Sequence, residues 1–387
     1  MPSQISAASP GELFNVIRLS GGMTRQQLLT HTGMARSTLY GRLDQLTNAG
    51  LICEAGVTDS TGGRPASLLA FDDSERAVLT IDVGHHRAAV ALYTASGEVL
   101  GELTCLRTAA EPLEDLADRV EGLVDQLLAE RPGKRLIGLG LAIPTPVNVH
   151  TGRRLPSVAM PEASYPLSER LAQRYGVPVA VENDARAFAI GAAAEVPPMD
   201  PDGVLLGVKY STGIGIGLLT GGHIMRGTSG AAGDLGHLQI TPGEGPTCTC
   251  GRRGCLAAYA SGRALVKEFA RDDISDVGDL VCSYDQGDVQ VMEAVHHAAT
   301  ILGTQVGGLV QVSNPQYVVF GGFLGGRPTI ADRVIESIKL QVSDRISTAA
   351  DYRVVGGDDT TAAGLLALVM ELALSPEAIN TLVGANA

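Results

Sequence analysis

Three of the six cysteines in this sequence lie within the segment CTCGRRGC at 248–255, and a histidine precedes them at position 237. Structural zinc sites are built from thiolate and imidazole ligands that close a tetrahedron around the ion. In a compartment where thiols stay reduced, a tight cysteine cluster is more typical of metal binding than of disulfides. We therefore predict a zinc site whose ligands are His237, Cys248, Cys250 and Cys255.

The local sequence is compatible with such a site. Gly251 and Gly254 allow the chain to curl back and deliver the third thiolate. We expect His237 to begin a strand at 237–241. Four protein ligands leave no open coordination position, so we expect a structural zinc rather than a catalytic one. The alternative is three ordinary thiols.

Two glycine-bearing segments raise the question of phosphate binding. The segment STGIGIG at 211–217 offers backbone N–H groups that no side chain shields, although glycine-rich hairpins also occur without a ligand. The segment IDVGHHR at 81–87 has one glycine followed by two bulky histidines. This second segment is unfavourable for a nucleotide.

Length and composition indicate what kind of protein must position these residues. A chain of 387 residues with 45% hydrophobic residues predicts a globular protein of two or three domains. No apolar run approaches the length of a membrane span, and the N-terminus lacks a secretory pattern, so we expect a cytoplasmic protein that does not enter a membrane. Net charge is −13, yet residues 1–71 carry +1. The uneven charge suggests a head and a body with different functions.

Residues 1–72 predict a winged helix-turn-helix domain. We expect helices near 11–19, 25–30 and 36–49, with Thr24 capping the second, followed by a two-stranded wing. The third helix would bury Leu39, Leu43 and Leu46 and begin at Ala35 without a side-chain cap. Its other face would enter the major groove of operator DNA, while a residue of the wing reaches the minor groove. The candidate DNA contacts are Arg36, Ser37, Thr38, Tyr40, Arg42 and Arg64. The alternative is a small protein-interaction module with solvated arginines.

The rest of the chain repeats one plan. Segments 76–105 and 204–228 each have the pattern of strands joined by a tight turn, at Ser96-Gly97 in the first and at Gly221-Gly222 in the second. Each copy is followed by helices and a further strand. A duplication of this kind predicts two related α/β lobes with a ligand cleft between them. We assign 76–195 to the first lobe and 196–387 to the second, which holds the zinc motif. A C-terminal helix near 360–375 is expected to pack back on the first lobe.

Several of these segments together resemble the ROK family of repressors, open reading frames and sugar kinases. The similar segments are GDLGHLQITPGEGPTCTCGRRGCLAAYASG, VENDARAFAIGAA, STGIGIG and VVFGG, with the head resembling the DNA-binding half of ROK repressors. The resemblance covers essentially the whole chain. It implies a two-lobed, actin-like and hexokinase-like ATPase fold in the body, and a homodimer or homotetramer.

The resemblance also implies roles for residues of the sugar site. Asn183 would bind a sugar hydroxyl, Asp184 would be the general base of a kinase, and Asp234 and His237 would lie near the sugar. Asp184 could instead simply cap the helix that follows it. In the family's kinases a glutamate stands where this chain has Ala257, another stands in place of Asp234, and the phosphate loop is richer in glycine than DVGHHR. We therefore expect no catalysis, with Asp184 a vestigial base.

Three functions remain open on these grounds. The first is a transcriptional regulator, a repressor of sugar-metabolism genes, that binds operator DNA and a sugar or sugar-phosphate effector. The second is an ATP-dependent sugar kinase, acting on a hexose or amino sugar, that retains a DNA-binding head. The third is a DNA-binding protein whose body only dimerises.

Overall fold

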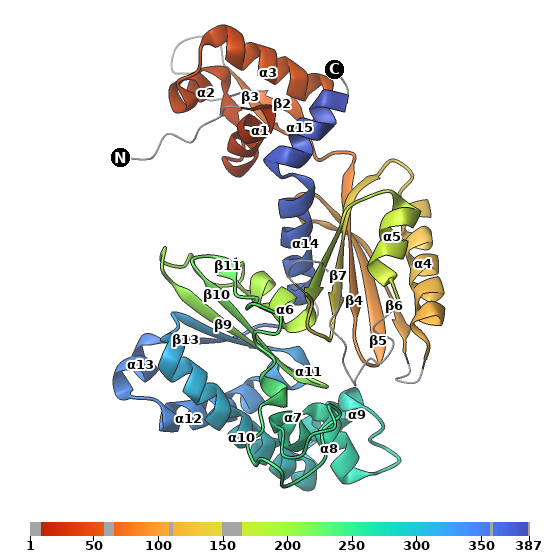
Figure 1. Ribbon diagram of the computed structural model, residues 1–387, viewed down its shortest axis with the longest axis vertical. Coiled ribbons are helices and arrows are strands. Elements are labelled where there is room, and N and C mark those ends of the chain that lie inside the picture. The colour runs from red at the N-terminus through yellow and green to blue at the C-terminus, as the bar shows by residue number, and fades with distance from the viewer. Residues whose placement is uncertain (1–8, 58–65, 108–110, 149–164, 357–358, 386–387) are drawn as a thin grey trace.

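The computed structural model describes residues 9–57, 66–107, 111–148, 165–356 and 359–385. Figure 1 shows a helical head at the top and two α/β lobes beneath it. Within the described residues no single helix is long and apolar enough to cross a membrane, although the bent pair of the last two helices meets that requirement together.

The head is a three-helix unit with a small sheet. Thr24 caps the second helix through a capping box with Gln27, whereas Ala35 provides no side-chain cap for the third, both as predicted. Leu39, Leu43 and Leu46 are buried, which confirms the predicted core face. The elements are α1 (Pro10–Leu19), β1 (Met23–Thr24), α2 (Arg25–Thr32), α3 (Arg36–Asn48), β2 (Ile52–Val57) and β3 (Ser67–Phe71), with strand order β1-β3-β2.

The last helix of the chain, α15 (Pro376–Ala385), completes the core of the head. Ile379 and Val383 are buried in one cluster with residues of α1 and α3. The N–H of Gly11 donates to Asn380 Oδ1 at 2.8 Å, and a Cβ at position 11 would lie 2.2 Å from the carbonyl oxygen of Pro376. In Figure 1 the C-terminus accordingly lies beside α3. This placement differs from the assignment of residues 376–385 to the second lobe.

The two lobes share one sheet topology, as the repeated sequence pattern predicts. Each has three antiparallel strands followed by two parallel ones, in the orders β6-β5-β4-β7-β8 and β11-β10-β9-β12-β13. The first sheet contains β4 (Arg76–Val83), β5 (Arg87–Thr94), β6 (Val99–Leu106), β7 (Arg135–Ile143) and β8 (Val179–Asn183). The second contains β9 (Val204–Tyr210), β10 (Ile214–Thr220), β11 (His223–Ile224), β12 (Tyr317–Gly321) and β13 (Asp351–Val354).

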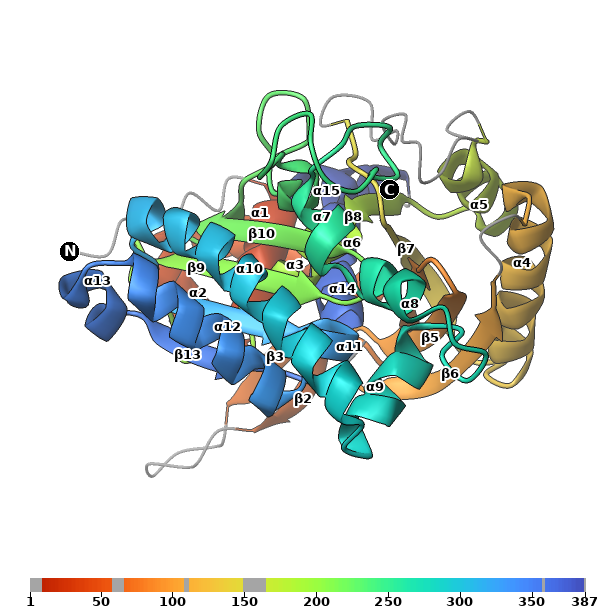
Figure 2. The same cartoon turned by 90° about the horizontal axis from the view of Figure 1, so that it is seen from below.

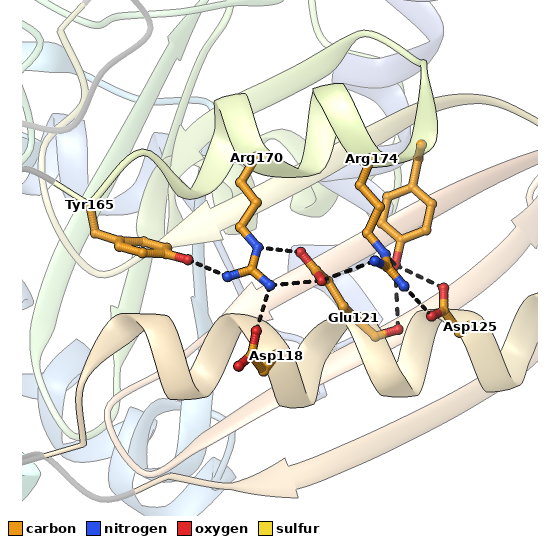
Figure 3. Close-up of polar contacts among 7 residues, drawn as sticks. Asp118, Glu121, Asp125, Tyr165, Arg170 and Arg174 are labelled. Carbon is orange, nitrogen blue, oxygen red and sulfur yellow. Dashed lines mark hydrogen bonds and ion pairs between the residues drawn. The ribbon is translucent and has the colours of Figure 1, made fainter.

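Two helices, α4 (Leu113–Ala129) and α5 (Leu167–Tyr175), cover one face of the first sheet. Figure 3 shows how they are joined: Arg170 and Arg174 of α5 reach across to carboxylates of α4. Arg170 Nε donates to Glu121 Oε1 at 2.6 Å, and Glu121 is buried. This network clamps α5 in place on the outer side of the lobe.

Long helices cover the second sheet. Figure 2, seen from below, shows α10 (Val289–Ser313) and α12 (Pro328–Gln341) side by side across it, and their apolar faces form the largest core. The remaining helices of this lobe are η1 (Leu235–His237), α7 (Leu256–Ala260), α8 (Gly262–Phe269), α9 (Val277–Asp285), α11 (Gly322–Gly325) and α13 (Asp344–Ala349).

One helix connects the two lobes, and a second continues from them to the head. The first, α6 (Asp184–Ala192), follows β8 and packs on β9 and β10 of the other lobe. The second, α14 (Asp359–Ala373), packs on α6 and on β7 and then bends by 50° into α15. At the crossing a Cβ on Gly364 would lie 1.8 Å from the carbonyl oxygen of Ala187, so α14 and α6 are in backbone contact.

Candidate functional site

The four predicted metal ligands lie together in the second lobe. His237 is the last residue of η1, Cys248 and Cys250 lie on the turn that follows, and Cys255 directly precedes α7. Their ligand atoms all lie within 4.8 Å of one another. His237 is not on the predicted strand, because its N–H bonds the carbonyl of Asp234 at 3.2 Å and closes a 3-10 turn.

The donor atoms fit a tetrahedral zinc ion. Cys250 Sγ lies 3.7 Å from Cys255 Sγ, and Cys248 Sγ lies 3.4 Å from His237 Nδ1. Ligand distances of about 2.3 Å for sulfur and about 2.0 Å for nitrogen give tetrahedral edges of about 3.8 Å and about 3.5 Å. Both of these separations match such edges, and three sulfurs with one nitrogen form the donor set typical of structural zinc.

The loop that carries the cysteines depends on its glycines, as the sequence suggests. Gly251 and Gly254 have φ of 85° and 78°, which side-chain-bearing residues rarely adopt. A Cβ at position 254 would lie 1.9 Å from the carbonyl oxygen of Thr241. Arg252 adds a bond from Nη2 to the carbonyl of His237 at 2.9 Å. These contacts hold the cysteine turn against η1.

A cleft of about 990 Å³ lies between the lobes. Its walls come from the 84–87 turn of the first lobe, the start of α6, the 211–215 loop of the second lobe and the metal loop. The cleft therefore gathers segments that are far apart in the sequence. It includes all of the predicted sugar-site residues, namely Asn183, Asp184, Asp234 and His237.

The start of α6 places two of those residues. Asn183, not Asp184, is the N-cap, because Asn183 Oδ1 accepts from the N–H groups of Ala185 and Arg186 at 3.1 and 3.2 Å. This corrects the alternative in which Asp184 caps the helix. Asp184 is the first helical residue, and its Oδ1 accepts from Asn183 Nδ2 at 3.2 Å and from the N–H of Ala185 at 2.9 Å.

Sequence reasoning missed a lysine at the base of the cleft. Lys209, on β9, lies with its Nζ 3.0 Å from Asp184 Oδ2 and 3.9 Å from Asp82 Oδ2. Burial opposes its charge, yet the two carboxylates keep the pKa of Lys209 above its ordinary value. The sequence feature that could have indicated this residue is a single lysine within the apolar segment VLLGVKYS, directly before the glycine-rich loop.

A second unpredicted network supports the start of α6. Glu182 and Arg186 are each 1% exposed, and Arg186 Nε donates to Glu182 Oε1 at 2.7 Å. Arg226 Nε donates to the other oxygen of Glu182 at 2.8 Å, and Arg186 Nη1 donates to the carbonyl of Gly230 at 2.7 Å. The network thus ties α6 to the loop that leads to Asp234.

The two residues that depart from the pattern of the family's kinases, Asp234 and Ala257, both line the cleft. Asp234 is exposed there, and Ala257 lies on the first turn of α7. A methyl group at position 257 cannot accept a hydrogen bond, so this wall offers a sugar hydroxyl no partner from that side chain.

The turn between β4 and β5 carries the two histidines. Gly84 N–H donates to the carbonyl of Arg87 at 2.9 Å, and Arg107 Nη1 donates to the carbonyl of Gly84 at 2.9 Å, so the turn is tightly held. Burial, reinforced by the nearby Arg263, lowers the pKa of His85 to about 3. His85 is therefore a neutral imidazole that lines the cleft beside the phosphate-loop position.

The glycine-rich loop is bound to a helix rather than left open. The N–H groups of Gly262 and Arg263, at the start of α8, donate to the carbonyls of Ser211 and Thr212 at 3.0 and 3.1 Å. The loop itself is closed by a bond from the N–H of Ser211 to the carbonyl of Gly213 at 2.9 Å. The loop therefore has a fixed shape.

The candidate DNA-reading face lies on the outer side of α3. Arg36, Ser37, Thr38 and Tyr40 are exposed, and the guanidinium of Arg36 lies over the ring of Tyr40. Arg42 is half-buried and its Nη1 contacts Met34 Sδ at 3.8 Å. The sixth candidate, Arg64, lies outside the described residues.

Comparison with known proteins identifies a matching family and a similar curated protein. The model of the ROK family matches residues 78–371. The xylose repressor of Bacillus subtilis (strain 168) is 28% identical over 342 residues, which cover 86% of each protein.

Two solved structures have a similar fold. One is a ROK family transcriptional regulator, a homologue of the E. coli MLC protein, with a TM-score of 0.75 and 23% identity over 97% of this chain and 98% of that one. The other is the ROK hexokinase from Thermus thermophilus, with a TM-score of 0.58 and 27% identity over 76% of this chain and 98% of that one. The first extends over the head as well as the body, and together they confirm the predicted fold class.

Proposed function

This chain belongs to the ROK family, and we propose that it is a sugar-responsive transcriptional repressor. Its head would bind operator DNA, and its cleft would bind a sugar or sugar phosphate that controls genes of sugar metabolism. The similarity to a xylose repressor along most of both chains supports this proposal. A homodimer or homotetramer would present paired heads to two half-sites about one helical turn apart.

One observation carries the proposal: a continuous set of contacts links the cleft to the head. Asn183 and Asp184 start α6 in the cleft, α6 is in backbone contact with α14, and α14 runs into α15. The buried residues of α15 belong to the core of the head. A ligand that prefers one position of α6 would therefore change the orientation of the head, provided it binds the two states with different affinity.

We assign a structural zinc ion to His237 and the three cysteines. The ion would hold η1, the cysteine turn and the start of α7 together, and so would shape the wall of the cleft that contains Asp234 and Ala257. It would contribute to folding rather than to chemistry.

The direct experiment is to map the DNA sites bound by the full-length protein and to test their release by sugars. Genes beside the bound sites suggest a sugar, and gel retardation with that sugar and its phosphate measures the response. We expect specific binding that one of these ligands weakens. If calorimetry finds no binding of any sugar while DNA binding persists, the body only dimerises and the sensing role is wrong.

A sugar kinase is the second candidate, because Asp184 lines the cleft and the STGIGIG loop is present. Phosphoryl transfer depends on positioning and charge stabilisation more than on the base. The histidines at the phosphate-loop position and Ala257 weaken both, so we expect no turnover. ADP release with hexoses and amino sugars tests this: a rate near ~1 s⁻¹ that disappears in Asp184→Asn would make the protein a kinase.

A further inference from the structure

Three charged side chains from three different elements meet at the base of the cleft. Lys209 comes from β9, Asp184 from the first turn of α6 and Asp82 from β4 of the other lobe. Their side chains are 14%, 22% and 16% exposed, so they are largely enclosed. Lys209 Nζ is 3.0 Å from one carboxylate and 3.9 Å from the other.

Close packing of the backbone brings them together. Lys209 is paired with Gly215 across the β9–β10 hairpin. A Cβ at position 215 would lie 2.5 Å from the Cβ of Ala185, so the first turn of α6 lies directly on this hairpin. The contact sets Asp184 next to Lys209 at a fixed height above the sheet.

The two carboxylates depend on Lys209 to different degrees. Asp184 Oδ1 already accepts from Asn183 Nδ2 and the N–H of Ala185, and its Oδ2 accepts from Lys209. Asp82 Oδ1 is buried and has no hydrogen-bond partner among the described residues. Burial raises the pKa of Asp82 above its ordinary value, and Lys209 opposes that rise. A carboxylate enclosed in this way must either be paired with a cation or take up a proton.

We propose that Lys209 is a positioning residue whose ammonium is the built-in counter-ion of the cleft. It stands between Asp82 and Asp184, where two facing carboxylates would otherwise take a divalent cation. Three consequences follow. The carboxylate of Asp184 is engaged on both oxygens, it is held in place as an acceptor for a ligand hydroxyl, and the cleft needs neither a divalent cation nor a nucleotide to bind its ligand.

The first consequence rests on contacts alone, and the other two rest on the proposed sugar-binding function. A test that uses a metal ion as its probe therefore separates the two. Mn²⁺ is suitable because the signal of the free aqueous ion in electron paramagnetic resonance disappears when the ion binds to protein, and its preference for oxygen ligands matches two carboxylates.

The experiment compares Mn²⁺ binding by zinc-loaded, full-length wild type, Lys209→Met and Lys209→Gln. Removal of the ammonium leaves two carboxylates without their counter-ion. We therefore expect each variant to bind one Mn²⁺ per chain at this site, with an affinity at least about tenfold higher than that of wild type. Asp82→Asn added to either variant should abolish the gain. Melting curves and zinc content show which variants are folded, and having two substitutions guards against the failure of one.

Two outcomes would overturn the proposal. Either the folded Lys209 variants bind Mn²⁺ no more tightly than wild type, or the gain persists when Asp82→Asn is added. A separate calorimetric titration concerns the sugar: its affinity for wild type should be the same with and without added Mg²⁺. A sugar that binds only with Mg²⁺ contradicts the counter-ion role, whereas a complete lack of sugar binding contradicts the proposed function and leaves the Mn²⁺ result standing.

Discussion

The head and the cleft of the body present their polar side chains in opposite ways. On the head, Arg36, Ser37 and Thr38 are consecutive residues of one helix and are exposed. In the cleft, Asp184 and Lys209 come from different elements, are largely enclosed and bond each other. The first arrangement would be completed by the proposed DNA partner, and the second is satisfied within the chain.

This difference predicts how each region responds to substitution. Enclosed charged and metal-binding groups must be compensated when the protein folds, so changes to them should reduce stability or release metal. Exposed side chains on a helix contribute little to folding, so changes to them should affect binding alone. The four predictions below test this division, beginning with the largest expected effect.

Cys250→Ser should have the largest effect, because binding free energy at a structural metal site is also folding free energy. We expect the variant to lose its zinc and to be destabilised by at least several kcal/mol. Metal analysis and calorimetric melting measure the two losses. Cys282→Ser, at an exposed cysteine outside the cluster, is the matched control and should change neither. A full zinc complement in Cys250→Ser would contradict the ligand assignment.

Gly11→Ala tests whether α15, at the end of the chain, stabilises the head by packing on α1. The new Cβ would meet the carbonyl of Pro376, so we expect the contact between α1 and α15 to weaken by about 1–3 kcal/mol. Native-state hydrogen exchange of α1 amides measures this loss. Gly41→Ala is the control, because nothing lies within 4 Å of that position and alanine favours helix by up to about 1 kcal/mol. Equal exchange in Gly11→Ala and wild type would separate α15 from the core of the head.

Arg36→Ala should weaken specific DNA binding without changing stability, because its side chain is exposed at the start of the reading helix. If it contacts a guanine, the loss is about 1–3 kcal/mol. Binding titrations on a mapped site and melting curves give the two values. Arg333→Ala, an exposed arginine of the second lobe, should bind DNA as wild type does. Unchanged DNA affinity in Arg36→Ala would remove this residue from the reading face.

His85→Gln should have the smallest effect and one that depends on pH. The pKa of His85 is about 3 in the folded protein, below the value of about 6.5 in an unfolded chain, so the unfolded state binds more protons between these values. Stability is therefore lost as pH falls below 6.5, by about 1.4 kcal/mol between pH 7.5 and 5.5.

When unfolding is followed by urea titration at several pH values, the variant's free energy of unfolding should fall by about 1.4 kcal/mol less than that of wild type between pH 7.5 and 5.5. His31→Gln, at an exposed position on α2 of the head, is the control and should have the same pH profile as wild type. An identical slope in His85→Gln would mean that the imidazole is not enclosed.

Local patterns made several elements predictable. The four metal ligands lie within twenty residues, and the donor types alone indicate zinc. The helix-turn-helix followed from the cap at Thr24 and from leucines at helical spacing. The cap of α6 was assigned one residue late, because Asn and Asp both favour that position and the sequence does not distinguish them.

The meeting of Lys209 with Asp82 could not be predicted. Positions 82 and 209 lie on strands of different sheets, and their separation depends on how α6 packs between the lobes. The same applies to α15, whose apolar residues could have packed on either lobe as far as their spacing shows. In both cases close packing at a glycine brings together segments that are far apart in the sequence. Gly215 packs on Ala185 of α6, and Gly11 packs on Pro376 of α15.

The sequence by itself determined the kinds of site that this protein carries: a His-Cys₃ cluster, a duplicated α/β body and a winged helix-turn-helix. Each is set by residue types at short spacing, where hydrogen bonding, capping and ligand chemistry act locally. Only the tertiary structure decided which charges compensate one another in the cleft and which helix completes the head. Those choices depend on burial. A carboxylate needs its counter-ion once packing has excluded water from it, and an apolar helix face is stabilised by whichever partner removes it from water.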